Sequence, residues 1–170
     1  LGAVKDNLGV RIDGDIQLVA GFSMGGACAL FHGVDRPEVF SHVYAYAGAF
    51  SASERIGDPY AQQRTIDMLI PTEKEHNRVW GMKNSEIRNR YSPETIVNTA
   101  SVIRPMLPDI RIVVGRSDFT RILEMNRQMH DLLMEHDIEH EYFEVEGNHN
   151  MDFAAITLAD WLNIILAPGD

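Results

Sequence analysis

The sequence predicts an α/β fold, in which a parallel sheet of about four strands carries helices on both faces. This prediction rests on apolar strand-like runs that alternate with segments of helical periodicity. With 170 residues, 45% of them hydrophobic, the chain is long enough to bury one sizeable core. No repeat or low-complexity segment interrupts the alternation, so we expect a single domain over residues 1–170.

Each strand is predicted where apolar residues run together or alternate with polar ones. The four predicted strands are 16–20, 41–48, 109–115 and 139–147, and the last is expected at an edge or half buried. Helices are predicted at 25–33, 119–136 and 152–166, and residues 1–9 are typical of a helix end closed by glycine. The final helix is expected to carry one apolar side, made of Phe153, Ile156, Trp161, Leu162 and Ile165.

Residues 51–106 break this rhythm, because they carry many charges and no clear strand. We interpret this segment as an insertion of loops and short helices over the carboxyl ends of the strands, packed over the sheet edge. The alternative is that part of it forms the wall or lid of a pocket. Phe50, at the end of the second predicted strand, and Met24 are predicted to face that pocket. Trp80 is a further candidate, although a tryptophan in a charged segment is more often a packing anchor.

Composition excludes several classes of partner. The net charge of −10 argues against nucleic acid or an anionic membrane surface. No apolar run approaches the roughly 18 residues of a membrane span. The single cysteine excludes an intrachain disulfide. No basic and then apolar leader opens the sequence, so the compartment is not specified.

The stretch GFSMGG at residues 21–26 connects the first predicted strand directly to a helix. Gly-x-Ser-x-Gly in this context is the nucleophile-elbow pattern, in which a sharp turn lifts the serine clear of the sheet. Small residues are required on both sides of Ser23, and Gly21 and Gly25 supply them. The helix dipole and the backbone N–H of Met24 would stabilise negative charge beside Ser23. The alternative is an ordinary glycine-rich turn.

A serine nucleophile requires a histidine base, and the base requires an orienting carboxylate. In this architecture the acid and then the histidine follow the serine along the chain. His149 lies in a short loop between the last predicted strand and the last helix, whereas the other histidines lie in predicted elements or in the charged middle. Asp118 follows the strand 109–115, where it could instead cap the next helix. We predict Ser23, Asp118 and His149 as a catalytic triad.

Four stretches carry a resemblance to a known family: GFSMGG, RPEVFSHVYAYAGAF, IVVGRSDF and EHEYFEVEGNHNMDF. Together they resemble the putative-esterase family of α/β-hydrolases, which includes feruloyl and acetyl-xylan esterases, enterochelin esterases, S-formylglutathione hydrolases and mycolyltransferases. The resemblance extends over nearly all of the chain and is weakest in the middle. It places the family's nucleophile on Ser23, its acid on Asp118 and its histidine on His149, where Gly147-Asn148-His149 replaces the usual Gly-Gly-His.

The resemblance also implies missing strands, because family members have a larger sheet, whereas this chain begins one helix before the elbow. We therefore expect the C-terminal part of an α/β-hydrolase, without the loop that supplies the second oxyanion donor. The strand 16–20 would then form an open edge that no charge, proline or bulge protects. Self-association through this edge is expected, together with poor ester hydrolysis by the isolated chain.

The predicted function is that of a serine esterase, which cleaves a small-molecule or carbohydrate-linked ester through an acyl-enzyme. His149 would take the proton of Ser23 while Asp118 holds the imidazole, and no cofactor or metal is required. His136 and His140 do not share a predicted helix, so they are not expected to bind zinc. Two alternatives stay open: an acyltransferase that uses the same triad, and a non-catalytic module that retains the elbow.

Overall fold

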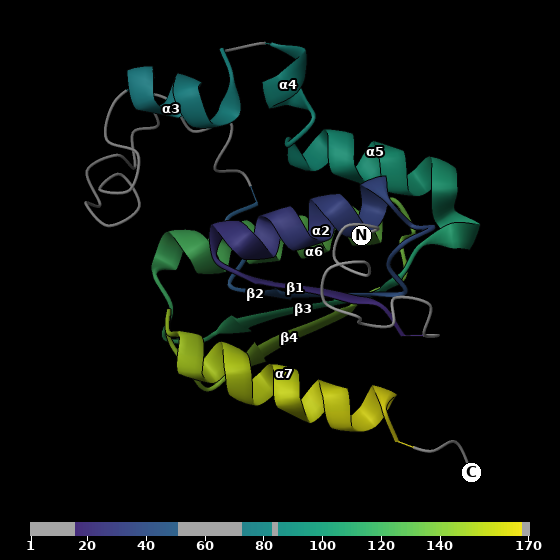
Figure 1. Ribbon diagram of the computed structural model, residues 1–170. Helices are drawn as coiled ribbons and strands as arrows, with labels where there is room; N and C mark the ends of the chain where they lie inside the picture. The colour runs from purple at the N-terminus through teal and green to yellow at the C-terminus, as the bar shows by residue number, and fades with distance from the viewer. Residues whose placement is uncertain (1–15, 51–72, 83–84, 168–170) are drawn as a thin grey trace, which may run out of the picture.

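The fold is built on a parallel sheet of four strands (Figure 1). The computed structural model describes residues 16–50, 73–82 and 85–167. The strands lie in the order β1 (Leu18–Phe22), β2 (His42–Tyr46), β3 (Asp109–Gly115) and β4 (Glu141–Val145). Every neighbouring pair is parallel, and the register sets Leu18 opposite His42 and His42 opposite Asp109. The predicted α/β class with a parallel sheet is confirmed.

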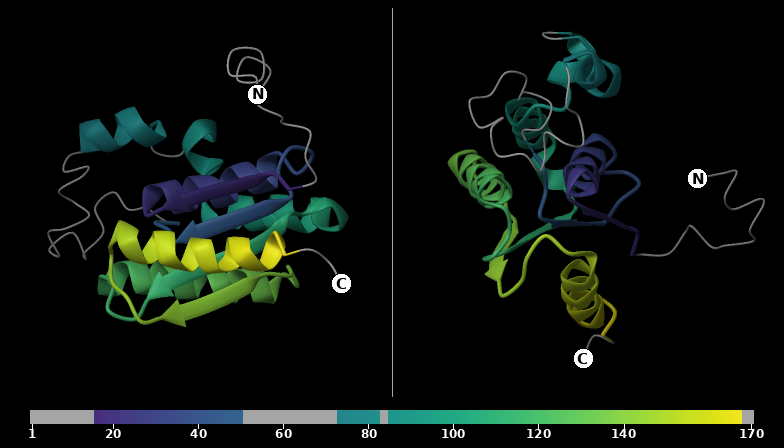
Figure 2. Two further views of the ribbon diagram at one scale, coloured as in Figure 1. Left: turned by 60° about the horizontal axis from the view of Figure 1, so that its bottom comes forward. Right: turned by 90° about the vertical axis from the view of Figure 1, so that its left-hand side faces the viewer.

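Helices cover both faces of this sheet, as Figure 2 shows from two further sides. One face carries α2, α5 and α6, and α7 lies against the other. The bounds of these helices are α2 (Met24–Asp35), α5 (Pro93–Ile103), α6 (Thr120–Glu135) and α7 (Met151–Ile165). The first three lie in the crossovers that parallel strands require. Among the described residues, no helix combines the length and the apolar character needed to cross a bilayer.

The central strands supply the core on both faces of the sheet. In β2, Val43 and Ala45 pack in the cluster with α2 and α5, whereas Tyr44 packs toward α7 and Tyr46 toward the loop before it. β3 is rich in buried β-branched residues, as interior parallel strands commonly are. β4 is only partly buried and lies at an edge of the sheet, as its alternating polarity predicted.

Two details of the predicted elements are wrong. The first strand is Leu18–Phe22, not 16–20, because pairing with β2 continues to the residue before the elbow serine. In α7, Ile156 is 58% exposed, whereas Ala154 and Trp161 are buried. The helix meets the sheet along the face that carries Ala154, and a residue two positions further on points away from that face.

The described part of the segment 51–106 is helical. It contains α3 (Glu73–Trp80), α4 (Glu86–Asn89), α5 and a 3-10 turn at Arg104–Met106. Ser85 and Ser92 cap α4 and α5, since each side chain accepts a backbone N–H of the first turn. Because α5 packs against α2 and α6, it belongs to the helix layer. A cover over the strand ends stays a prediction. Four ranges lie outside the described residues: 1–15, with the predicted helix end, 51–72, 83–84 and 168–170.

β1 forms an edge of the sheet. Within the described ranges it pairs with β2 and with no other strand. Ala20, at its centre, is exposed although it lies in a strand. The described residues therefore contain the open edge that the sequence indicated, while self-association through this edge stays a prediction.

Candidate active site

The turn between β1 and α2 has the strained geometry of a nucleophile elbow. Ser23 occupies it with φ 59° and ψ −121°, a conformation that residues with a side chain rarely adopt. The backbone holds the turn on both sides, because Ser23 N–H donates to the Tyr46 carbonyl at 3.0 Å and the Ser23 carbonyl accepts from Ala49 N–H at 3.0 Å. The end of β2 and the loop after it thus compensate for the strain.

The glycines of the elbow differ in what surrounds them. A Cβ at Gly21 would lie 1.9 Å from the Gly25 carbonyl oxygen, so only glycine fits there. A Cβ at Gly25 would meet nothing within 4 Å, so the requirement predicted for a small residue at Gly25 is wrong. The second close approach is at Gly26, where a Cβ would come within 3.1 Å of the Tyr46 carbonyl oxygen.

His149 reaches the serine from the loop between β4 and α7. Its Nε2 lies 3.0 Å from Ser23 Oγ. Two phenylalanine rings flank the imidazole, Phe22 with ring centroids 4.6 Å apart and Phe119 with centroids 5.1 Å apart. The His149 side chain is 17% exposed. The aromatic packing therefore fixes the ring while one part of it stays accessible.

Asp118 lies on the opposite side of the imidazole. Its two oxygens are 2.9 and 3.2 Å from His149 Nδ1, and its side chain is fully buried. The Phe119 N–H donates to Asp118 Oδ1 at 2.7 Å and so fixes the carboxylate. The alternative role as helix cap is not what the structure shows, because Phe119 holds the N-cap position of α6 without a side-chain cap. A carboxylate at Nδ1 favours the tautomer with its proton there, which leaves Nε2 to accept the Ser23 hydroxyl.

The three side chains come from loops at the same end of the sheet. Ser23 follows β1, Asp118 follows β3 and His149 follows β4. The arrowheads in Figure 1 point to the end of the sheet where these loops lie. Met24 is the first residue of α2, so its backbone N–H is one of the first-turn donors that have no acceptor within the helix. A donor beside Ser23 Oγ is the position that an oxyanion site requires.

Phe50 and Trp80 are both buried in the core. Phe50 is 2% exposed and packs in the cluster below α2, since the chain turns after β2 and the ring folds back over Gly48. Trp80 is 6% exposed and meets the Tyr91 ring edge-on with centroids 5.5 Å apart. Phe50 and Trp80 both line one small gap between side chains. The predicted orientation of Phe50 toward the serine cavity is therefore corrected.

Residues that the sequence did not single out hold the loops around the serine. Asn126 of α6 is fully buried, accepts the Gly48 N–H at 3.1 Å and donates to the Gly48 carbonyl at 2.9 Å. Tyr46 donates its hydroxyl hydrogen to the Asn148 carbonyl at 3.2 Å. An asparagine on the apolar face of a helix was the available signal for Asn126, because buried polar groups need partners. No sequence signal singled out Phe22 and Phe119, which are the chain neighbours of Ser23 and Asp118.

No metal centre is found among the described residues, since they contain no suitable group of three or more His, Cys, Asp or Glu side chains. His136 and His140 lie apart: His136 Nδ1 is 3.4 Å from Ser101 Oγ, and His140 Nε2 is 2.8 Å from His130 Nδ1. Burial lowers the pKa of His140, and His130 adds to that effect. Each of these histidines thus takes part in a local hydrogen bond of the fold.

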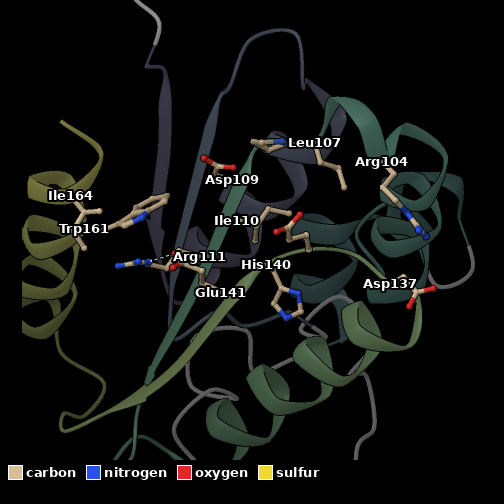
Figure 3. A pocket seen from close by; sticks show the side chains of 12 residues that line it. Arg104, Leu107, Asp109, Ile110, Arg111, Asp137, His140, Glu141, Trp161 and Ile164 are labelled. Atoms are coloured by element: carbon tan, nitrogen blue, oxygen red, sulfur yellow. Dashed lines mark hydrogen bonds and ion pairs between the residues drawn. The ribbon is translucent and has the colours of Figure 1, made fainter. Parts of the chain in front are cut away.

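A hollow of about 540 Å³ lies at the opposite end of the sheet, at the amino ends of β3 and β4 (Figure 3). Arg111 points into it, but this guanidinium pairs with Glu141 at 2.7 Å and lies over the Trp161 ring at 5.1 Å. Among the residues that the structure describes, no serine or cysteine lines this hollow. Its described lining therefore offers no alternative to Ser23 as a nucleophilic centre.

Comparison with known proteins shows which family this chain resembles. A family model described as putative esterase matches residues 1–160. The acetyl esterase of Caldicellulosiruptor saccharolyticus is 27% identical over 135 residues, which make up 79% of this chain and 48% of that protein. The chain thus spans about half the length of this curated relative.

Solved structures share the fold at lower identity. Fluorophosphonate-binding serine hydrolase F of Staphylococcus aureus has a TM-score of 0.72 and 15% identity, with 98% of this chain and 60% of that chain covered. The S-formylglutathione hydrolase of Staphylococcus aureus has a TM-score of 0.68 and 15% identity, with 96% and 59% covered. At these identities the likeness shows the fold alone, and the fold is that of α/β-hydrolases.

Proposed function

The chain belongs to the putative-esterase family, and from this membership we propose that it is a serine hydrolase that cleaves carboxylic esters with Ser23, His149 and Asp118. The observation that carries the proposal is the 3.0 Å contact between His149 Nε2 and Ser23 Oγ, on an imidazole whose Nδ1 faces a buried carboxylate. A serine hydroxyl becomes nucleophilic when such a base accepts its proton.

The reaction proceeds by two acyl transfers. As Ser23 Oγ attacks the ester carbonyl carbon, its proton moves to His149 Nε2, and the buried Asp118 stabilises the imidazolium that forms. The backbone N–H of Met24 donates to the developing oxyanion, and the amino terminus of α2 adds its dipole. The imidazolium then gives its proton to the departing alcohol oxygen, which leaves an acyl-enzyme on Ser23.

Water completes the cycle. His149 takes a proton from the attacking water, and the acid leaves when Ser23 Oγ recovers its proton from the imidazolium. Small-molecule or carbohydrate-linked esters are the proposed substrates. An alcohol that replaces water at this step would receive the acyl group, which is the reaction of the acyltransferase alternative.

Fluorophosphonate labelling and hydrolysis of p-nitrophenyl acetate test the proposal in the intact protein. We expect label on Ser23, and we expect Ser23→Ala and His149→Ala to abolish both labelling and hydrolysis. Ser101→Ala is a matched control, because Ser101 Oγ also lies beside a histidine nitrogen, at 3.4 Å, but donates its proton to the Val97 carbonyl.

Three outcomes separate the alternatives. Labelling that persists in Ser23→Ala, or that is lost in Ser101→Ala, would contradict the assignment of the nucleophile. An unlabelled wild-type protein would favour the non-catalytic module. Release of an alkyl ester when excess alcohol is added, at the expense of free acid, would identify an acyltransferase.

A further inference from the structure

One buried residue contacts both loops that carry the proposed nucleophile and base. Tyr46 ends β2, and its backbone carbonyl accepts the Ser23 N–H at 3.0 Å. Its side-chain hydroxyl donates to the Asn148 carbonyl at 3.2 Å. The Asn148 carbonyl belongs to the peptide bond that precedes His149. Tyr46 is therefore bonded to the elbow through its main chain and to the histidine loop through its side chain.

The histidine loop needs such a support. It follows β4, a partly exposed edge strand, and Gly147 takes a φ of 157° to make the turn. The Asn148 carbonyl accepts two hydrogen bonds, from Tyr46 and from the Asn150 N–H at 2.8 Å. Only the Tyr46 bond ties this carbonyl to an interior strand, since Asn150 lies in the same loop. The loop has a second tie, because the Ser117 N–H after β3 donates to the Gly147 carbonyl at 2.9 Å, but the Tyr46 hydroxyl is the bond made by the peptide next to His149.

The Tyr46 hydroxyl stays a donor over the whole working range of an esterase. Tyr46 has no exposed surface, and burial raises its pKa to about 12, to which the negative charge of Asp118 contributes. The phenol therefore keeps its proton at neutral and moderately alkaline pH. Its ring also lies beside Phe22, with centroids 6.0 Å apart, and Phe22 in turn packs on the imidazole.

We propose that Tyr46 is a positioning residue of this site, which holds His149 Nε2 at hydrogen-bonding distance from Ser23 by fixing the Asn148 peptide. The inference rests on the proposed function, because it assigns a role in activating Ser23. Tyr46 is not a catalytic residue, since its hydroxyl bonds the loop and touches neither the serine hydroxyl nor the reacting atoms.

Tyr46→Phe tests this role, because it removes the hydroxyl and keeps the ring. Tyr44→Phe is a matched control: Tyr44 lies two residues earlier in β2, is equally buried, and directs its hydroxyl to Thr157 and to the Ala154 carbonyl in α7. Burial raises the pKa of Tyr44 to about 12 as well. Each variant therefore loses one buried phenol hydroxyl, but only one of the two bonds the histidine loop.

We expect Tyr46→Phe to lower kcat for p-nitrophenyl acetate and the rate of fluorophosphonate labelling about tenfold, or about 1.4 kcal/mol. KM should not change, and Tyr44→Phe should stay within about twofold of wild type at a similar Tm. A second readout does not need turnover: the downfield proton resonance of His149 Nδ1–H should be sharp in wild type and in Tyr44→Phe. It should broaden in Tyr46→Phe, because a loosened loop exposes that proton to exchange.

Equal rates and equal resonances in the two variants would overturn the positioning role while the proposed function stands. Unfolding of Tyr46→Phe under conditions where Tyr44→Phe stays folded would overturn it too, since the hydroxyl would then support the fold as a whole. A wild-type protein without labelling would refute the proposed function, and the proton resonance would still decide whether Tyr46 fixes His149.

Discussion

Replacement of Asp118 by asparagine changes one atom and should nearly abolish activity. The Phe119 N–H donates to Asp118 Oδ1 at 2.7 Å, so in the variant the amide oxygen must occupy that position. The amide nitrogen then takes the place of Oδ2, 3.2 Å from His149 Nδ1, while the amide oxygen stays 2.9 Å from the same nitrogen. The imidazole proton either remains on Nδ1, facing a neutral acceptor, or moves to Nε2 so that Nδ1 accepts from the amide. In the first form no carboxylate charge stabilises the imidazolium, and in the second form His149 donates to Ser23 Oγ when it should accept.

The expected loss in kcat is about 10³- to 10⁴-fold, or about 4–5.5 kcal/mol, because the variant has no charge to stabilise the imidazolium and its amide also favours the wrong tautomer. The assay is hydrolysis of p-nitrophenyl acetate with a thermal unfolding scan of each protein. Asp109→Asn is the control, since that side chain is 81% exposed at the other end of β3. If folded Asp118→Asn kept more than about a tenth of wild-type kcat, the reasoning on the tautomer would be refuted.

Three further predictions concern the elbow glycines, the buried Asn126 and the buried His140. Gly21→Ala should prevent folding or lower Tm strongly because its Cβ would overlap the Gly25 carbonyl, whereas Gly25→Ala should leave Tm unchanged or higher; equal effects in a thermal scan would contradict the elbow geometry. Asn126→Ala should lower the free energy of urea unfolding by about 2–4 kcal/mol, since two buried backbone groups lose their partners, and exposed Gln128→Ala should not. The pKa of His140 lies below its ordinary 6.5 in the folded protein, so the unfolded chain binds the proton more readily and stability falls as pH drops through that range. His140→Gln should flatten the pH dependence of the urea midpoint, and an unchanged slope would exclude His140 as its source.

The sequence predicted the elements whose signal is local. β3 was placed at its observed bounds because its apolar run has a polar residue at one end and a glycine at the other. Ser23, Asp118 and His149 were predicted to lie together because each follows a strand and the carboxyl ends of parallel strands meet at one end of the sheet. Their side chains do lie within hydrogen-bonding distance, while their catalytic role stays a proposal. A local pattern was sufficient in these cases, because the parallel order of the strands then brings the loops at their carboxyl ends together.

Features that depend on tertiary contacts were not predicted. The direction of the Phe50 ring is set by the turn after β2, where Ala47 takes a φ of 50° that the sequence does not indicate. Ile156 fits a helical period as well as Ala154 does, and only the line of contact between α7 and the sheet decides which one is buried. Tyr46 lies in the predicted strand 41–48 and was not singled out there, although its hydroxyl bonds a loop 102 residues away. No local pattern contains such a partner.

The 126 residues that separate Ser23 from His149 also set an order of events during synthesis. At about 5–20 residues per second, the serine leaves the ribosome roughly 6–25 s before the histidine does. In that interval the elbow has neither its base nor the last strand of the sheet. On the proposed mechanism the nascent serine is therefore an ordinary alcohol, and its reactivity would begin only when β4 has joined β3 and brought the histidine loop into place.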